Sequence, residues 1–129
     1  NMESRGYTVA VYNRTVAKVD EFCNGNARGK NIIGTKSIEE FCASLKTPRK
    51  VMLMVKAGAA VDEFIEKTMP YLQAGDILID GGNSFFPDSI RRTKYVESKG
   101  FRYIGTGVSG GEEGALKGPS TGVILGKEN

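Results

Sequence analysis

The sequence predicts an α/β protein with a doubly wound parallel sheet, in which helices wrap the strands. Short β-rich runs alternate with amphipathic helical segments along the chain. The run Val51–Val55 is apolar at every position. Such a run is typical of a strand buried on both faces, as in parallel sheets. Polar or glycine-rich loops follow the strands, where open α/β sheets bind their ligands.

The composition excludes several classes of function. The 129 residues are enough for one domain with a core and too few for two. A net charge of +3 is too small to indicate a nucleic-acid or membrane partner, and no apolar run is long enough to span a bilayer. The absence of histidine excludes Ser-His-Asp and Cys-His nucleophiles and the usual zinc sites, so we expect no metal. Cys23 and Cys42 lack metal-ligand spacing and are expected to be reduced thiols of a cytoplasmic protein.

The first part of the chain predicts two strands and two helices. They are a strand at Tyr7–Tyr12, a helix from Val16 to about Cys23, a brief strand at Asn31–Gly34 and a helix to about Leu45. β-branched and aromatic residues between turn formers indicate the strands. Thr15 is placed to cap the first helix, and Ser37 with Glu40 forms a capping box for the second.

The rest of the chain predicts four more strands and two more helices. They are a strand at Val51–Val55, a helix from about Ala60 to Leu72, a strand at Asp76–Asp80, a helix from Pro87 to about Lys99, and strands at Phe101–Thr106 and Ser120–Leu125. The first of these helices carries an apolar stripe formed by Val61, Phe64, Ile65 and Met69. Gly75 and Gly100 are expected to end the two helices, and the pair Arg91-Arg92 is interpreted as a solvated helix face.

Both ends of the sequence are expected to lie inside a longer chain. Asn1–Gly6 has the pattern of a helix's last turn, with Gly6 as its left-handed stop. Gly126–Asn129 follows directly on a strand-like run. We therefore expect the doubly wound sheet to be truncated at both ends.

The segment Gly107–Ala115 holds four glycines in nine residues. Glycine loses much backbone freedom on folding, so packed elements avoid it. The segment is therefore expected to be a ligand loop at the end of a strand, a tight surface turn being the alternative. Glu112 and Glu113 are candidate acid–base carboxylates, of which at most one is expected to reach a ligand.

Three further loops carry candidate ligand groups. At Asn13-Arg14-Thr15 a guanidinium, a hydroxyl and a helix start follow a strand, which favours the 2′-phosphate of NADP over NAD. The alternative is a routine helix cap beside a surface arginine. Lys56 and Asn83 follow the next strands at Lys56-Ala57-Gly58 and Asp80–Ser84, with a surface lysine and a turn-forming asparagine as the alternatives.

Together these motifs resemble those of the 6-phosphogluconate dehydrogenases, decarboxylating NADP enzymes of the oxidative pentose phosphate pathway. The resemblance runs from Asn1 to about Ser120 and rests on four segments, which are Tyr12–Thr15, Val55–Gly58, Ile79–Ser84 and Gly107–Ala115. Related β-hydroxyacid dehydrogenases share the Ser-Gly-Gly core of the last segment but seldom its Glu-Glu-Gly-Ala. The sequence after Ser120 departs from the family pattern.

The resemblance implies a Rossmann-like fold and specific site residues. It implies that the cofactor NADP is bound by Asn13, Arg14, Thr15, Val55, Lys56, Ala57 and Asn83. It implies that the substrate 6-phosphogluconate is bound by Asn83, Ser109, Gly110 and Gly111.

The resemblance also implies what lies outside these residues. The first strand and its Gly-rich pyrophosphate loop would precede Asn1. The catalytic lysine base, the catalytic glutamate acid and a helical substrate and dimerisation domain would follow residue 129. In the family, the base takes the proton of the C3 hydroxyl as hydride leaves for NADP, carbon dioxide is lost, and the acid protonates the enediol to give ribulose 5-phosphate. We therefore assign no catalytic residue here, and expect a partial NADP-binding domain that is inactive alone, from a cytoplasmic homodimeric parent.

Two alternatives remain at this point. One is another β-hydroxyacid dehydrogenase, of the 3-hydroxyisobutyrate type, against which Arg14 and the Glu112-Glu113 pair argue. The other is a non-catalytic NADP-binding module. Substrate screening of the full-length parent distinguishes the first. The sequence downstream in the parent gene distinguishes the second, because a lysine and a His-Asn-containing helix followed by a glutamate would support the enzyme and their absence the module.

Overall fold

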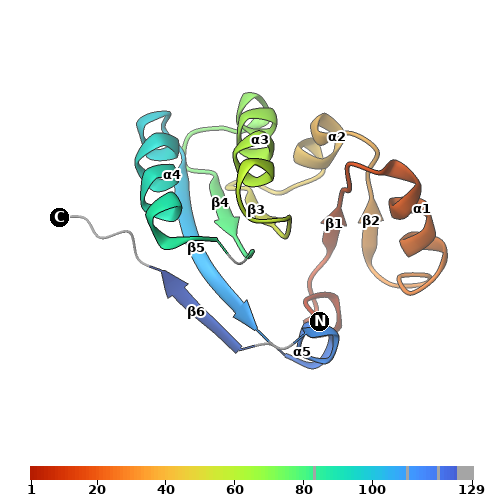
Figure 1. Ribbon diagram of the computed structural model, residues 1–129. Coiled ribbons are helices and arrows are strands. Elements are labelled where there is room, and N and C mark those ends of the chain that lie inside the picture. The colour runs from red at the N-terminus through yellow and green to blue at the C-terminus, as the bar shows by residue number, and fades with distance from the viewer. Residues whose placement is uncertain (83, 110, 119, 125–129) are drawn as a thin grey trace. The chain divides into compact units, whose positions relative to one another are not determined.

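A computed structural model of the chain describes residues 1–82, 84–109, 111–118 and 120–124. Strands and helices alternate along it as the sequence predicts (Figure 1). The chain divides into two compact units, Asn1–Leu45 and Lys46–Asn129. Within the described part of the chain, none of the helices is long and apolar enough to cross a membrane.

The first unit holds a small parallel sheet and two helices. Its elements are a 3-10 turn at Glu3–Arg5, β1 at Val9–Val11, α1 at Val16–Asn24, β2 at Ile32–Gly34 and α2 at Ile38–Ala43. β1 and β2 pair in parallel, with Ala10 opposite Ile33. The predicted stop at Gly6 is confirmed, with a φ of 98° in the left-handed region. The predicted cap at Ser37 is also confirmed, because its hydroxyl accepts the backbone N–H of Glu40 at 3.0 Å.

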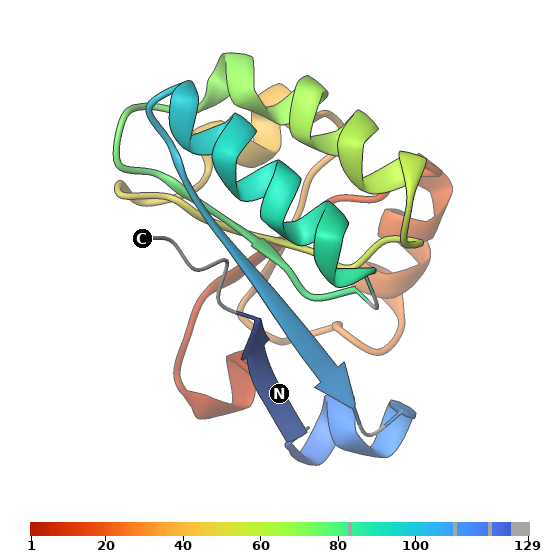
Figure 2. The same cartoon turned by 60° about the vertical axis from the view of Figure 1, so that its left-hand side comes forward.

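The second unit holds a four-stranded sheet with two long helices. Its elements are β3 at Lys50–Leu53, α3 at Ala59–Thr68, a 3-10 turn at Met69–Tyr71, β4 at Ile77–Asp80, α4 at Phe86–Ser98, β5 at Arg102–Ser109, α5 at Gly111–Lys117 and β6 at Ser120–Ile124. The strand order is β3-β4-β5-β6. Helices α3 and α4 lie side by side over β3, β4 and β5 (Figures 1 and 2). The core between these helices and the strands is formed by Val51, Leu53, Val61, Ile65, Leu78, Val96 and Tyr103.

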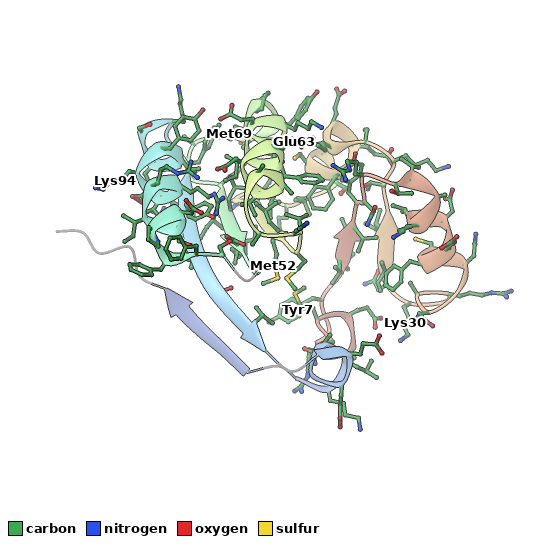
Figure 3. The ribbon with its side chains drawn as sticks, in the orientation of Figure 1. Tyr7, Lys30, Met52, Glu63, Met69 and Lys94 are labelled. Carbon is green, nitrogen blue, oxygen red and sulfur yellow. The ribbon has the colours of Figure 1, made fainter. Side chains whose placement is uncertain are left out.

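Strand β3 corrects one prediction. Its burial alternates, so that Val51 and Leu53 are buried whereas Met52 is 41% exposed. Figure 3 shows Met52 on the face of the sheet away from α3. The expectation of a strand buried on both faces is therefore wrong for the described residues, in which α3 and α4 cover one face. An unbroken apolar run does not distinguish these two situations by itself.

The segment Gly107–Ala115 corrects a second prediction, because it is largely regular structure. Strand β5 continues to Ser109, and α5 begins at Gly111. Pairing with β6 supplies backbone hydrogen bonds to the glycine-rich end of β5, where Gly107 lies opposite Gly122. This pairing offsets the entropy cost on which the loop prediction depended. In α5, Glu113 and Lys117 form an i,i+4 ion pair at 3.6 Å.

The orientation of the last strand was not predicted. β3, β4 and β5 pair in parallel, as expected, but β6 pairs antiparallel to β5. The predicted strand Ser120–Leu125 is present as Ser120–Ile124, and residue 125 lies outside the described residues. The described residues between β5 and β6 form the short helix α5 and Gly118, and the chain then returns beside the strand it has just left.

Candidate functional site

In the first unit, the predicted cofactor residues Asn13, Arg14 and Thr15 lie between β1 and α1. The side-chain oxygen of Asn13 accepts the backbone N–H of Thr15 at 2.8 Å, which forms a turn at the start of the helix. Thr15 occupies the N-cap position, as predicted, but its side chain makes no capping hydrogen bond. The capping role that the sequence predicted for its hydroxyl is therefore wrong.

The guanidinium of Arg14 is exposed and pairs with no carboxylate among the residues that the structure describes. Asn13 and Thr15 are exposed as well. A free guanidinium, a free hydroxyl and the start of a nine-residue helix at one point of the chain make a suitable set of donors for a phosphate group.

In the second unit, the loops that follow β3 and β4 lie at the same edge of the sheet. β3 and β4 are neighbouring strands whose last residues, Leu53 and Asp80, lie opposite each other. The loops that follow the two strands therefore begin side by side. Gly81 donates its N–H to the carbonyl of Leu53 at 2.9 Å, which continues the pairing past the end of β4. The structure therefore brings the loop that carries the predicted residues Val55, Lys56 and Ala57 close to Gly81 and Gly82 of the second loop.

The residues of the first loop differ in exposure. Lys56 and Ala57 are exposed and Val55 is half-buried. Gly58 ends the loop with a φ of 98° and precedes the first turn of α3. A residue with a Cβ rarely adopts this conformation, so glycine fixes where the loop turns into the helix.

The second loop needs its glycines for close packing. A Cβ on Gly82 would lie 3.0 Å from the carbonyl oxygen of Val55 and 3.2 Å from the carboxylate of Asp80. A Cβ on Gly81 would lie 2.5 Å from the sulfur of Met54. Both loops therefore pack backbone against backbone at this edge. Asn83 itself lies outside the described residues.

The third predicted segment, Ser109, Gly110 and Gly111, falls at the junction of β5 and α5. Ser109 is the last residue of β5 and Gly111 the first of α5. Gly110 lies outside the described residues. β5 pairs with β4 in parallel, so its carboxyl end leaves the sheet toward the same edge as that of β4.

A buried ionic cluster lies behind these loops, and the sequence reasoning missed it. Arg92 of α4 and Asp80 at the end of β4 each have 1% of their side chain exposed, and their charged groups are 3.9 Å apart. The interpretation of Arg91-Arg92 as a solvated face is therefore wrong for Arg92. The sequence did hold a signal in its spacing, because Arg92 lies three residues after Ser89 and four residues before Val96, on one face of the helix. In the structure, all three of these residues are buried.

Hydrogen bonds fix the charges of this cluster. Arg92 donates two hydrogen bonds to the carboxylate of Asp62, at 2.9 and 3.2 Å. Hydrogen bonds from Arg92 above all, and from Arg91, lower the pKa of Asp62 to about 2. Burial beside the Asp80 carboxylate raises the pKa of Tyr103, whose hydroxyl donates to that carboxylate at 3.2 Å. Asp62 is therefore ionised and Tyr103 is a neutral donor at neutral pH.

Parallel strands joined by helices, with ligand-type loops at their carboxyl ends, define a Rossmann-like dinucleotide-binding domain. The family model that describes the NAD binding domain of 6-phosphogluconate dehydrogenase matches residues 1–129. The chain belongs to this family.

Individual relatives agree with the family match. The chain is 62% identical over 120 residues to a decarboxylating 6-phosphogluconate dehydrogenase of Cunninghamella elegans and 64% identical over 120 residues to that of Dictyostelium discoideum. These matches cover 93% of this chain, and 25% and 24% of the two relatives. The chain thus spans about a quarter of the length of the curated relatives it matches.

Solved structures agree as well. The chain is similar to Plasmodium falciparum 6-phosphogluconate dehydrogenase, described in its apo form, with its cofactor NADP+ and with its substrate 6-phosphogluconate. The TM-score is 0.86 at 43% identity, over 94% of this chain and 26% of that chain. The fold assigned from the sequence is confirmed.

Proposed function

We propose that this chain is the NADP-binding part of a decarboxylating 6-phosphogluconate dehydrogenase. Such an enzyme oxidises 6-phosphogluconate to ribulose 5-phosphate and carbon dioxide and forms NADPH. The observation that carries the proposal is the identity of 62% and 64%, over 93% of the chain, to two relatives that bear this name. The loops after β3 and β4, which leave the same edge of the sheet, and the parallel strand β5 beside them support it.

We assign the cofactor to two sets of residues, one in each unit. Asn13, Arg14 and Thr15 would hold the adenosine ribose and its 2′-phosphate, because a free guanidinium, a hydroxyl and a helix start fit an added phosphate. Val55, Lys56, Ala57 and Asn83 would line the cofactor from the second unit. The side-chain donors of Arg14, Thr15 and Lys56 fit the phosphates of NADP, which when bound would accept the substrate's hydride.

We assign the substrate 6-phosphogluconate to Asn83, Ser109, Gly110 and Gly111. These positions would orient the sugar acid beside the cofactor, and none of them is given a proton-transfer role. We further propose a homodimeric parent enzyme in the cytoplasm. The two cysteines, Cys23 and Cys42, form no disulfide in the structure, which supports a reducing compartment.

Cofactor preference tests the proposal most directly, and Arg14→Glu is the informative variant. In the full-length enzyme, we expect kcat/KM with NADP to fall by about 100-fold, because a charged hydrogen bond to phosphate is replaced by repulsion. The value with NAD should change by less than about threefold, because NAD lacks the 2′-phosphate. The matched control is Arg28→Glu, an exposed arginine of the same unit, which should leave both values unchanged.

Steady-state kinetics with 6-phosphogluconate and each cofactor give these values. An equal loss with NADP and NAD would remove the role assigned to Arg14. Oxidation of 3-hydroxyisobutyrate in place of 6-phosphogluconate, or NADP binding without any turnover, would contradict the proposed enzyme itself.

A further inference from the structure

The buried pair Asp80 and Arg92 connects the two loops that leave the sheet after β3 and β4. Arg92 lies on α4, yet its contacts reach three other segments of the second unit. Two of these contacts fall next to a residue proposed to bind the cofactor, because Gly58 follows Ala57 and Ser84 follows Asn83. This placement is the starting point of the inference, which rests on the function proposed above.

The guanidinium group of Arg92 holds the loop before α3. Its Nη2 atom donates to the carbonyl oxygen of Gly58 at 3.0 Å and to the carboxylate of Asp62 at 3.2 Å. Gly58 directly follows Lys56 and Ala57, and Asp62 lies in the first turn of α3. Arg92 therefore fixes both the end of this loop and the helix that follows it.

The carboxylate of Asp80 holds the loop after β4 from two sides. One oxygen accepts the backbone N–H of Gly82 at 2.9 Å. The other accepts the hydroxyl of Ser84, which also lies 3.5 Å from Nη1 of Arg92. Gly82 and Ser84 are the sequence neighbours of position 83 on either side. A single buried carboxylate thus holds both flanks of that position.

Stability alone is a weak reason for such a cluster. Burying an arginine and an aspartate costs much of their hydration, and apolar side chains of similar size often stabilise a core as well or better. A planar guanidinium with several donors instead sets the relative position of several backbone segments at once. We infer that Asp80 and Arg92 are positioning residues, which hold residues 56–58 and residues 81, 82 and 84 in the arrangement that binds NADP.

The neighbouring arginine provides a matched control. Arg91 lies on the same helix, also bonds Asp62, at 3.2 and 3.3 Å, and forms a further ion pair with Asp88 at 3.5 Å. Its side chain is 56% exposed, and its contacts include neither Gly58, Asp80 nor Ser84. Arg91→Lys therefore loses guanidinium bonds to Asp62 without touching the two loops.

The test compares Arg92→Lys, Ser84→Ala and Arg91→Lys in the full-length enzyme. Each variant is titrated with NADPH by fluorescence, its kcat and its KM for NADP are measured, and its melting temperature is recorded without ligand. We expect Arg92→Lys to weaken NADPH binding and to raise KM for NADP by about tenfold or more, since small displacements of binding groups have large effects. Ser84→Ala should raise KM for NADP about threefold with little change in melting temperature, and Arg91→Lys should stay within about twofold of the parent.

A purely structural role predicts a different pattern. Arg92→Lys would then lower the melting temperature but leave KM for NADP and NADPH binding as in the parent, and that result overturns the inference. If Arg92→Lys does not fold, Ser84→Ala decides, and a KM equal to that of the parent overturns it. Failure of the proposed function is distinct, because it would show as a parent enzyme that does not oxidise 6-phosphogluconate, whereas NADPH titration still tests the positioning role.

Discussion

Asp76 is the residue whose replacement has the most definite structural consequence. Its side chain is 1% exposed and precedes β4. One carboxylate oxygen accepts the backbone N–H of Arg49 at 2.7 Å, and the other accepts the backbone N–H of Gln73 at 2.8 Å and the Arg49 guanidinium at 3.2 Å. The carbonyl of Asp76 accepts the N–H of Arg102 at 2.9 Å, so this residue joins the starts of β3, β4 and β5.

The cost of Asp76→Ala follows from these contacts. The change leaves the N–H groups of Arg49 and Gln73, whose hydrogen bonds are part-buried, without this acceptor, at up to about 1–3 kcal/mol each. It also removes the 3.2 Å ion pair of the Arg49 guanidinium, whose side chain is 13% exposed. We therefore expect a loss of about 3–5 kcal/mol in the free energy of unfolding, the range for breaking a buried ion pair from one side. Asp76→Asn keeps the shape but loses the charge, and should cost about 2–3 kcal/mol.

Urea unfolding followed by circular dichroism measures these losses, and hydrogen exchange at the amides of Arg49 and Gln73 locates them. Asp88→Ala is the control, because Asp88 is 38% exposed and forms an i,i+3 surface pair that should contribute less than about 1 kcal/mol. A loss below about 1 kcal/mol for Asp76→Ala, or unchanged exchange at the two amides, would refute the reasoning.

Two further predictions concern the candidate site. Gly82→Ala should destabilise the protein more than Gly81→Ala, because its Cβ would lie 3.0 Å from a backbone oxygen whereas that of Gly81 meets the flexible end of Met54; thermal melting of both variants checks the order, and the reverse order would contradict it. The pKa of Asp62, held at about 2 by hydrogen bonds from Arg92 first, lies below its ordinary value of 3.8. A lowered pKa contributes stability that is fully present above about pH 4 and is lost as the pH falls toward 2. Because the Asp62 side chain is 39% exposed, solvent screening reduces this contribution to about 1 kcal/mol. Acid titration of stability should therefore show the parent and Asp62→Asn converging below pH 4, and a constant difference down to pH 2 would contradict the assignment.

Much of the fold could be predicted from local signals in the sequence. Gly6 and Gly100 follow the ends of their helical elements with a positive φ, as glycine's conformational freedom predicts. Gly75 also has a positive φ, but the prediction that it ends a helix is wrong, because α3 ends at Thr68 and the 3-10 turn after it at Tyr71. The cap at Ser37 was equally readable, because its hydroxyl and the N–H of Glu40 are three residues apart. Such features depend on neighbours along the chain, so a single sequence reveals them.

Features that depend on distant segments could not be read in this way. The antiparallel return of β6 extends β5 through a glycine-rich segment, and that pairing is absent from any local window. Arg92 is buried because Asp62, Asp80 and the Gly58 carbonyl surround it, each supplied by a different element. For Thr15 the opposite error occurred, because its hydroxyl makes no capping hydrogen bond although the residue occupies the N-cap position. The local hydrogen bond at this helix start is instead made by the side chain of Asn13, which accepts the N–H of Thr15 itself.

The two sets of proposed cofactor residues differ in how far the structure prepares them. The loops of the second unit are held by Gly58, Gly82 and Ser84 through one buried ionic cluster. In the first unit, Arg14 is exposed and, among the described residues, has no partner that a phosphate would have to displace. A preformed site loses little conformational entropy on binding, whereas a free arginine must be ordered and gains a charged hydrogen bond in return. On this reasoning, changes in the cluster affect every dinucleotide alike, while changes at Arg14 affect only a ligand that carries the additional phosphate.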